Sequence, residues 1–414
     1  MDLIQTIRQY ILYLEVKRRH QFAGLASCVV LLMLVACIAS DQSREANRFA
    51  QAAGEVSSEL ENGTVFNPAV VESDVRASGG SHVKFRGVSS QSPGLFGMSG
   101  GDLPGVSATE RNRFLDDYKA MGVEWVRFDF LWWDIQREGP KSFDWAKYDA
   151  TVKALNRKGF RILGILTYSP QWARSSYCSS SYQCAPADVS DFAKFARAAA
   201  KRYAPMGVHY WEIWNEPNLG AFTNVAHYTN MLKASYTAIK EVDSSAYLLA
   251  GGSNGTFTQG DRISSEDFLQ GIYQNGGKDY FDAVAHHPYC YYPNLDCPTQ
   301  FARWSGWSRM NDTNPSLRSI MIANGDSAKK IWATEFGAPT GGDPEAVSKA
   351  RQAQMVTDAY KLWKSYNWAG GPLFWYNYWD YCTDATFECH FGLRENDLSP
   401  KPAYYKYKNM ATGQ

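Results

Sequence analysis

Apolar and amphipathic segments alternate along the chain between residues 83 and 378. Short, almost wholly apolar runs are typical of buried parallel strands, and longer stretches with helical apolar spacing separate them. The predicted strands are 83–88, 123–130, 160–167, 209–216, 247–251, 281–287, 330–335 and 372–378. The predicted helices are 108–121, 148–158, 189–203, 228–242, 266–274 and 346–366. Eight strands alternating with helices predict an α/β fold, a (β/α)8 TIM barrel.

The amino-terminal part of the chain has a different pattern. Residues 22–40 carry no charge, and a helix of that length, at about 1.5 Å per residue, nearly spans the roughly 30 Å hydrocarbon core of a bilayer. Residues 1–21 hold four basic and two acidic side chains, a net charge of +2, which favours a cytoplasmic position. We therefore expect a cytoplasmic segment at 1–21 and a transmembrane signal anchor at 22–40. The rest of the chain is then expected in the periplasm or at the cell exterior.

Two other fates of the apolar segment fit the same residues. The sequence Leu-Val-Ala-Cys at 34–37 resembles a lipoprotein processing box, which would place a lipid on Cys37. A cleaved signal peptide, leaving a secreted protein, is the other alternative. Residues 41–81 are polar and rich in Ala, Ser, Gly and Glu, and we expect a linker or stalk there, or one more helix packed on the barrel. The barrel domain is predicted at 82–414.

The charge balance limits the classes of partner. The 42 Lys and Arg residues equal the 42 Asp and Glu residues, so no nucleic-acid partner is expected. Because residues 1–21 carry +2 of a total of zero, the exported part carries about −2. Aromatic residues make up 14% of the chain; most are expected in the core, although exposed Trp and Tyr also present flat apolar faces. The oligomeric state is left open.

The eight cysteines fall into two groups. Cys28 and Cys37 lie in the apolar segment, and the other six form the close pairs Cys178/Cys184, Cys290/Cys297 and Cys382/Cys389. Each pair flanks a loop-like segment, and such pairs on an exported chain predict three local disulfides. A zinc site is the alternative, which the lack of a Cys-x-x-Cys spacing disfavours.

Polar and aromatic side chains gather where the predicted strands end. The run at 210–218, Tyr-Trp-Glu-Ile-Trp-Asn-Glu-Pro-Asn, stops at a proline and holds Glu216 beside Asn215. The strand at 330–335 ends on Glu335 before a Gly-containing turn. Two glutamates at strand ends of one barrel can converge on a single bond, as glycoside hydrolysis requires. The other side chains predicted at this end of the barrel are Arg127, Trp172, His287, Tyr289 and Trp375.

These motifs resemble the retaining glycoside hydrolases of clan A. The segments that carry the resemblance are Tyr-Ser-Pro-Gln-Trp at 168–172, Trp-Glu-Ile-Trp-Asn-Glu-Pro-Asn at 211–218, His-Pro-Tyr at 287–289 and Trp-Ala-Thr-Glu-Phe-Gly at 332–337. They are most similar to glycoside hydrolase family 39, in particular its endoglycosidase-like members, with family 5 next. The resemblance covers residues 83–408, is specific at the level of the clan and does not identify the sugar.

The resemblance implies that Glu216 is the general acid/base and Glu335 the nucleophile of a double displacement. The two carboxyl groups are then expected about 5 to 5.5 Å apart, and the pKa of Glu216 is expected to be raised by enclosure and by the charge of Glu335. Arg127 is expected to keep Glu335 ionised, with a structural ion pair to Asp129 as the alternative. Tyr289 is expected to orient Glu335.

The remaining candidates are substrate-binding residues. Asn215 is placed to bind a sugar 2-hydroxyl. His287 is expected to position Glu216 or a sugar hydroxyl, unless it is a core histidine. Trp172 and Trp375 are candidate stacking platforms for sugar rings, with core packing as the alternative.

No cofactor and no metal are expected, and the acids Glu212 and Glu345 do not match the family pattern. The leading hypothesis is a membrane-tethered retaining glycosidase that cleaves a β-linked polysaccharide or oligosaccharide. A transglycosylase would use the same residues, and a carbohydrate-binding barrel without catalysis is the third possibility. The sugar, its linkage and the choice between endo and exo action are left open.

Overall fold

A computed structural model describes residues 69–73, 81–85, 94–100, 103–222, 224–291, 296–342, 344–384 and 386–414. The chain divides into two compact units, Met1–Gln91 and Ser92–Gln414. In the first unit, β1 (Ala69–Ser73) pairs antiparallel with β2 (Ser81–Phe85). No helix among the described residues has the length and apolar character to cross a bilayer. The predictions for 1–21 and 22–40, and that for most of 41–81, lie outside the described residues.

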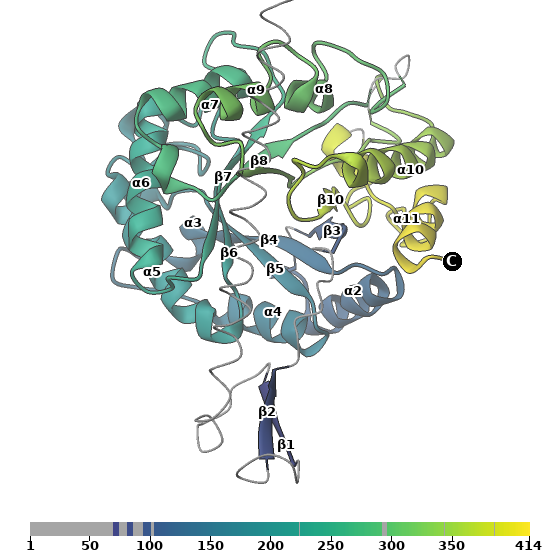
Figure 1. Ribbon diagram of the computed structural model, residues 1–414, viewed down its shortest axis with the longest axis horizontal. Coiled ribbons are helices and arrows are strands. Elements are labelled where there is room, and N and C mark those ends of the chain that lie inside the picture. The colour runs from purple at the N-terminus through teal and green to yellow at the C-terminus, as the bar shows by residue number, and fades with distance from the viewer. Residues whose placement is uncertain are drawn as a thin grey trace, which may run out of the picture. The chain divides into compact units, whose positions relative to one another are not determined.

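Eight parallel strands form the barrel of the second unit (Figure 1). Their order is β10-β3-β4-β5-β6-β7-β8-β9, and parallel bridges from Ile331 to Ala369 and from Phe336 to Trp375 join the two ends of the sheet. The (β/α)8 fold predicted from the sequence is therefore confirmed. The strands are β3 (Phe96–Ser99), β4 (Trp125–Leu131), β5 (Arg161–Thr167), β6 (Tyr210–Asn215), β7 (Tyr247–Asn254), β8 (Ala283–His287), β9 (Lys330–Ala333) and β10 (Leu373–Trp375).

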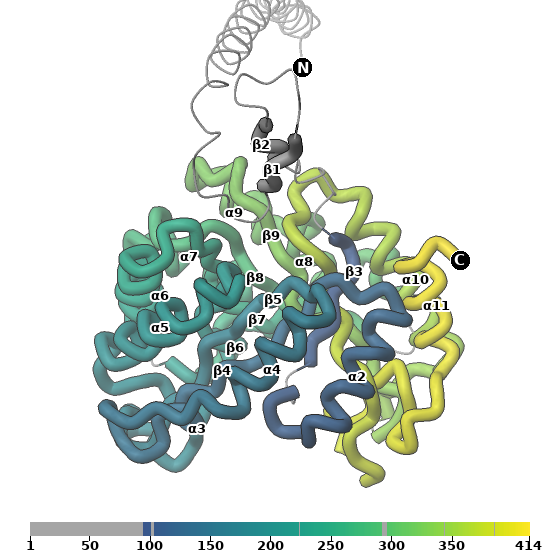
Figure 2. Tube along the Cα trace, turned by 90° about the horizontal axis from the view of Figure 1, so that it is seen from below, coloured from purple at the N-terminus to yellow at the C-terminus, as the bar shows by residue number. Residues whose placement is uncertain are grey.

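Helices lie outside the ring of strands in Figure 1, and Figure 2 shows α2 beside α4 and α10 beside α11. The first helix begins at Ser107, whose hydroxyl accepts from the Glu110 amide while the Glu110 carboxylate accepts from the Ser107 amide. The helices are α2 (Ala108–Ala120), α3 (Trp132–Ile135), α4 (Ala146–Arg157), α5 (Val189–Tyr203), α6 (Val225–Lys240), α7 (Ser265–Gln274), α8 (Gly306–Asn311), α9 (Leu317–Ala323), α10 (Lys349–Ser365) and α11 (Pro402–Thr412).

One predicted barrel strand is wrong. Residues 83–88 overlap β2, which pairs with β1, and the barrel begins instead at β3. The sequence Ser-His-Val-Lys-Phe at 81–85 is not the continuous apolar run that a barrel strand buried on both faces requires. All four residues of β3 are buried, as a barrel strand covered by helices requires. The other seven predicted strands overlap barrel strands, whereas α3, α8, α9 and α11 were missed.

Aromatic and aliphatic side chains fill the amino-terminal end of the barrel. Trp125 and Trp332 meet edge to face at 5.6 Å between ring centroids, and Tyr210 and Tyr247 pack beside them. Most of these side chains come from the first half of their strands, so this end of the barrel is a packed apolar core. The members of this cluster are Trp125, Leu163, Leu249, Ala283, Ala285, Trp332 and Phe374.

The three predicted disulfides are present. Their Cα–Cα distances are 5.4 Å for Cys178–Cys184, 5.6 Å for Cys290–Cys297 and 5.4 Å for Cys382–Cys389. Each disulfide lies in a segment that follows the carboxyl end of a barrel strand, namely β5, β8 or β10. The cross-links therefore stabilise loops at one end of the barrel.

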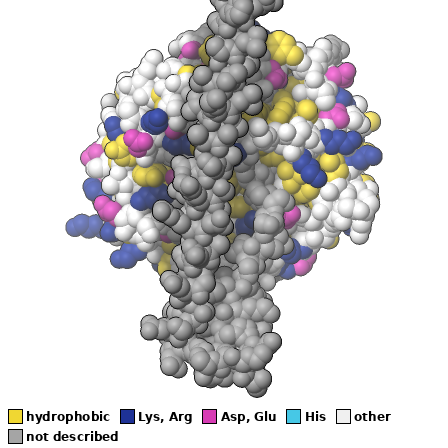
Figure 3. Space-filling view, in the orientation of Figure 1, with side chains coloured by type: hydrophobic (Ala, Val, Ile, Leu, Met, Phe, Trp, Pro, Cys, Tyr) yellow, Lys and Arg dark blue, Asp and Glu magenta, His cyan; other side chains and the backbone are white. Residues whose placement is uncertain are grey.

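Charged side chains of both signs are spread over the described part of the face drawn in Figure 3. Lys and Arg side chains lie near Asp and Glu side chains on this face, in keeping with the equal numbers of basic and acidic residues in the sequence.

Trp332→Ala should lower the free energy of unfolding by about 3–5 kcal/mol, because it leaves a cavity beside Trp125 and the two tyrosines of the cluster. The matched control is Tyr405→Ala, since Tyr405 is 53% exposed, and its effect should stay within about 0.5 kcal/mol. Urea unfolding followed by circular dichroism measures both. Equal stability of the two variants would contradict the assignment of Trp332 to the barrel core.

Candidate active site

A cavity of about 790 Å³ opens among the loops at the carboxyl end of the barrel. Its polar lining comes from several different strands, so no single segment of sequence forms the site. Arg127 and Asp129 lie within β4, and the lining side chains at or just beyond the ends of other strands are Asn215, Glu216, Asn254, Tyr289, Glu335 and Tyr376.

Glu216 follows β6 in an unusual backbone conformation. Trp214 and Glu216 have φ angles of 73° and 44°, in the left-handed region that L-residues other than glycine rarely adopt. The neighbouring strand fits closely, since a Cβ on Gly251 would lie 2.4 Å from the Ile213 carbonyl oxygen. Such strain costs about 1–3 kcal/mol for each residue and collects at functional sites. The backbone here thus directs Glu216 into the cavity.

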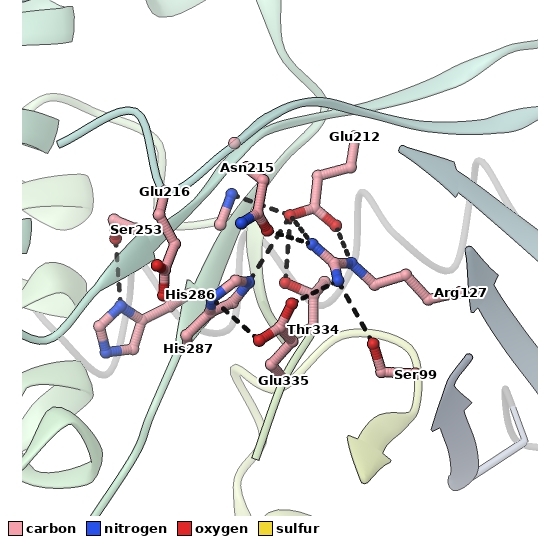
Figure 4. Close-up of polar contacts among 12 residues, drawn as sticks. Ser99, Arg127, Glu212, Asn215, Glu216, Ser253, His286, His287, Thr334 and Glu335 are labelled. Atoms are coloured by element: carbon pink, nitrogen blue, oxygen red, sulfur yellow. Dashed lines mark hydrogen bonds and ion pairs between the residues drawn. The ribbon is translucent and has the colours of Figure 1, made fainter. Parts of the chain in front are cut away.

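His287 joins the two predicted catalytic glutamates (Figure 4). Its Nδ1 atom lies 2.9 Å from Glu216 Oε1 and 3.5 Å from Glu335 Oε2. One oxygen of each carboxylate and one ring nitrogen of His287 all lie within 4.8 Å of one another. Retaining glycosidases hold their carboxyl groups about 5–5.5 Å apart and inverting ones about 6.5–9.5 Å. Since one oxygen of Glu216 lies within 4.8 Å of one oxygen of Glu335, the two acids are close enough to act on the same sugar carbon.

Arg127 connects Glu335 to a second, fully buried glutamate (Figure 4). Its Nη1 donates to Glu335 Oε1 at 2.6 Å, and its Nε donates to Glu212 Oε2 at 2.8 Å. Its Nη2 donates to Glu212 Oε1 at 3.2 Å and to Asn215 Oδ1 at 2.9 Å. Burial lowers the pKa of Arg127, but the charges of Glu212 and Glu335 outweigh it and hold the pKa above its ordinary value. The guanidinium is thus a fixed cation beside Glu335.

Glu212, set aside in the sequence analysis, holds this guanidinium in place. Its Oε1 also accepts from the Gly252 amide at 2.9 Å and from the Thr334 hydroxyl at 3.3 Å. A Cβ on Gly252 would lie 2.5 Å from Glu212 Oε1 and 2.3 Å from His287 Nε2, so only glycine fits there. An acid inside an otherwise apolar strand requires a buried partner, and this was the signal in the sequence.

The predicted contact between Tyr289 and Glu335 is present. The Tyr289 hydroxyl donates to Glu335 Oε2 at 2.8 Å. Burial, followed by the negative charge of Glu335, raises the pKa of Tyr289 well above its ordinary value. The phenol therefore keeps its proton and remains a donor to the carboxylate.

Two further side chains support Glu216 and Asn215. Asn254, at the end of β7, donates from Nδ2 to Glu216 Oε1 at 2.9 Å. The Tyr168 hydroxyl accepts from Asn215 Nδ2 at 3.1 Å, and Tyr168 also has a left-handed backbone, with φ of 66°. The sequence analysis missed Asn254, although it ends a strand beside the strand of Glu216.

The expected rise in the pKa of Glu216 is wrong for this structure. Burial raises the pKa, but the hydrogen bond and charge of His287, with Asn254 and Arg127, outweigh it and lower the pKa. Burial lowers the pKa of His287, but the charges of Glu335 and Glu216 outweigh it and raise that pKa. The two groups titrate as a pair, and their shared proton resides mainly on the imidazole.

The two predicted tryptophan platforms do not line the cavity. Trp375 is fully buried and packs edge to face on Phe336 at 5.7 Å. Trp172 donates from its indole to the Gln136 carbonyl at 2.7 Å and packs against another tryptophan. Neighbouring residues of an extended chain point to opposite sides, so Tyr376 lines the cavity in place of Trp375. The aromatic lining comprises Tyr118, Tyr168, Tyr182, Tyr289, Tyr291, Tyr376, Tyr378, Trp379, Tyr381, Phe387 and Phe391.

His286 has a structural role. Its Nδ1 lies 3.1 Å from the Ser253 hydroxyl oxygen, and its Nε2 donates to the Gly306 carbonyl at 2.9 Å. Burial lowers the pKa of His286 to about 3, so the ring is neutral. Cys290, which follows in the same loop, is bonded to Cys297.

A closed (β/α)8 barrel with two facing carboxylates at its carboxyl end defines the class of glycosidases. The chain belongs to the cellulase family, glycosyl hydrolase family 5, whose family model matches residues 78–380. No curated protein sequence matches the chain.

Solved structures of glycosidases have the same fold. A family 39 glycoside hydrolase from Bacteroides cellulosilyticus WH2 is similar with a TM-score of 0.60 and 21% identity, over 77% of this chain and 63% of that chain. A monomeric β-xylosidase from Caulobacter crescentus CB15 is similar with a TM-score of 0.57 and 20% identity, over 77% and 67%. A family 5 protein (GH5_18) from Streptomyces cattleya, solved with GlcNAc, has a TM-score of 0.56 and 14% identity, over 77% and 80%.

These comparisons confirm the resemblance to clan A, with family 5 and family 39 proteins both among the matches. The chain spans about two thirds of the length of the first two structures. At identities of 21% and below, the structures establish the shared fold, and the substrate of this chain is a separate question.

Glu212→Gln should reduce kcat by about tenfold or more, since a small misplacement of Arg127 and Glu335 is costly. The variant should also lose about 3–5 kcal/mol of unfolding free energy, because it breaks a buried ion pair. Glu241→Gln is the matched control, since Glu241 pairs with Arg197 at the surface and such pairs contribute about 0–1 kcal/mol. A decrease confined to stability, with unchanged kcat in the folded variant, would contradict a positioning role for Glu212.

His287→Asn should move the basic limb of the pH profile of kcat/KM to lower pH. In the wild type this limb reports loss of the proton shared with Glu216, and the pKa of His287 lies above its ordinary value of about 6.5. Without the imidazole, Glu216 alone must hold the proton, and a carboxyl releases it at lower pH. His227→Asn, on α6, is the control and should keep both limbs. An unshifted basic limb in His287→Asn would show that the pair does not share the catalytic proton.

Proposed function

We propose that the protein is a retaining β-glycosidase that cleaves a β-linked polysaccharide or oligosaccharide through a covalent glycosyl-enzyme intermediate. The observation that carries the proposal is the grouping of Glu216, His287 and Glu335, in which one oxygen of each carboxylate and one ring nitrogen lie within 4.8 Å of one another. The two glutamates line the cavity, and His287 is fully buried. Membership of glycosyl hydrolase family 5 supports the same reaction class.

Glu335 is the nucleophile of the first step. Arg127 and Tyr289 donate to its two oxygens, one each, at 2.6 and 2.8 Å, so both hydrogen bonds fix the orientation of the carboxylate. The carboxylate attacks the anomeric carbon as the bond to the leaving oxygen breaks.

Glu216 delivers the proton to the leaving oxygen. Its Oε1 is held by His287 and Asn254, which leaves Oε2 to face the substrate. Burial has the largest effect on the pKa of His287 and lowers it. The charge of Glu335 has the next largest effect and raises this pKa. As Glu335 becomes an ester, this charge disappears and the imidazolium loses its stabilisation. The proton of the pair then becomes available to the leaving group, and Glu216, ionised again, accepts a proton from the water of the second step.

A smaller hollow of about 240 Å³ adjoins the catalytic cavity beside Glu216. The two share Tyr168, Gln183, Asn215 and Glu216 in their linings. Because the acid/base group stands beside the leaving oxygen, this hollow is suited to the leaving part of the substrate. The Cys178–Cys184 loop contributes to its wall, and we assign that loop to leaving-group binding.

We also propose that the barrel acts outside the cytoplasm, tethered to the inner membrane by residues 22–40. Support comes from the positive residues before the apolar segment and from the three disulfides, which persist in oxidising compartments. Labelling of single cysteines with a membrane-impermeant thiol reagent in intact cells would test the orientation, and protection of sites in the barrel would contradict it.

Glu335→Gln should abolish turnover, because the amide cannot form the glycosyl ester. Glu216→Ala should lower activity on natural glycans by about 10²–10⁴-fold, yet spare the first step with aryl glycosides whose leaving groups need no proton. Azide should restore the second step of Glu216→Ala and yield a β-glycosyl azide. The measurement is product analysis by NMR, and an α-glycosyl azide or wild-type activity of Glu216→Ala on natural glycan would disprove these roles.

The substrate is tested with the purified full chain on panels of β-linked gluco-, manno- and xylo-oligosaccharides and polysaccharides. Release of products with retained β configuration is the expected result. The disulfide-bonded form should be used, and Glu335→Gln is the matched inactive control. Absence of cleavage of every β-glycoside would overturn the proposal.

A further inference from the structure

A second cavity, of about 630 Å³, lies outside the catalytic one. Its walls come from the start of the β7–α7 connection and α7, and from the segment around α8. No described residue of its lining also lines the catalytic cavity. The β7–α7 connection relates the two, because Asn254 and Arg262 line the catalytic cavity while Phe257 and Thr258 line the second one.

Two exposed phenylalanines border this cavity. Phe257 is 47% exposed and Phe301 is 58% exposed, although large apolar side chains are usually buried. They come from two different connections, yet both line the same cavity. Such rings offer flat faces that can stack on the apolar face of a sugar.

The base of the cavity contains a buried cation with unused donors. Arg309 is 3% exposed and donates from Nη1 to Glu266 Oε2 at 2.6 Å. Its Nε and Nη2 are buried and have no hydrogen-bond partner among the described residues. The Phe257 ring covers the guanidinium, with its centroid 4.3 Å from the central carbon. Buried donors without partners are rare and indicate a group or a water that completes them.

The backbone under the cavity is fixed. A Cβ on Gly255 would lie 2.6 Å from the Gly306 Cα atom, so the two connections touch through their glycines. On α7, the Asp267 carboxylate accepts from the Thr258 hydroxyl at 2.5 Å. The two aromatic walls are thus carried on segments that are packed against each other.

The charges of the lining favour an uncharged ligand. Two guanidinium groups, Arg303 and Arg309, face three carboxylates, Glu266, Asp267 and Asp312. This excess of negative charge disfavours an anionic glycan. A sugar hydroxyl both donates and accepts, so it can pair with the carboxylates and with the guanidinium groups.

We propose that this cavity is a second saccharide site, which binds a neutral β-linked glycan chain between Phe257 and Phe301 while the catalytic cavity holds another part of the chain or another chain. The choice of a glycan as ligand rests on the proposed function. The site raises the affinity for polymers through two-point attachment and takes no part in the bond cleavage.

The test uses the full chain carrying Glu335→Gln, titrated calorimetrically with β-1,4-linked gluco-, manno- and xylo-hexaose. We expect two binding sites for at least one of these probes. Adding Phe257→Ala and Phe301→Ala should remove one site, or weaken it by about tenfold or more through loss of the stacking faces. Phe301→Ala alone, at the more exposed position, should weaken the same site. Tyr405→Ala, which removes an exposed aromatic ring from α11, is the matched control and should keep both sites.

Each outcome separates this proposal from the proposed function. A single site, no binding of any probe, or two sites that persist in the double variant would overturn the second site. Tighter binding of an acidic oligogalacturonate at that site would overturn the assignment of a neutral ligand. In the catalytically active background, the double variant should cleave aryl glycosides like the wild type and show a higher KM for the polymer alone. If the wild type hydrolyses none of the glycans but the protein still binds them at two sites, the glycosidase proposal is disproved and the second site is retained.

Discussion

The arrangement of the site depends on one buried ion pair, that of Arg127 with Glu212. A guanidinium with almost no exposure to water is stable only beside a negative charge. Glu212 provides this charge and binds the guanidinium in a bidentate manner, through Nε and Nη2. Because Glu212 uses the Nε–Nη2 edge, Nη1 of Arg127 is directed to Glu335. The Glu335 carboxylate thus has a fixed partner before any substrate arrives, which is the preorganisation that the proposed electrostatic catalysis requires.

The same crowded end of the barrel determines where the proton is held. His287 lies between the negative charges of Glu216 and Glu335, and this position outweighs the effect of its burial on its pKa. Glu216 and His287 therefore hold their proton as a pair. In the mechanism proposed above, the release of this proton responds to the charge on Glu335.

The apolar side chains that stabilise the barrel and the polar side chains of the site lie at opposite ends of the barrel. The amino-terminal half is filled by the cluster around Trp125 and Trp332, and polar groups, left-handed residues and disulfide loops collect at the other end. The strain at Trp214 and Glu216 is tolerated because the packed strands below hold β6 in place. The segment that runs from the end of β7 towards α7 contributes lining residues to both cavities.

The sequence by itself determined the barrel, the three disulfides and the position of Glu216 and Glu335 at the carboxyl end of the barrel. The reason is that hydrophobic periodicity, cysteine spacing and strand-end motifs are local signals. Contacts across strands were decided by the tertiary structure. Glu212 and Asn254 acquire their roles only beside Arg127 and Glu216, which are distant in sequence. Trp375 was wrongly predicted to face the cavity, because neighbouring residues of a strand face opposite sides. The first barrel strand, β3, was missed because four residues are too few to show a hydrophobic period. The pKa of Glu216 depends on which charges surround it, and only the folded chain brings those charges together.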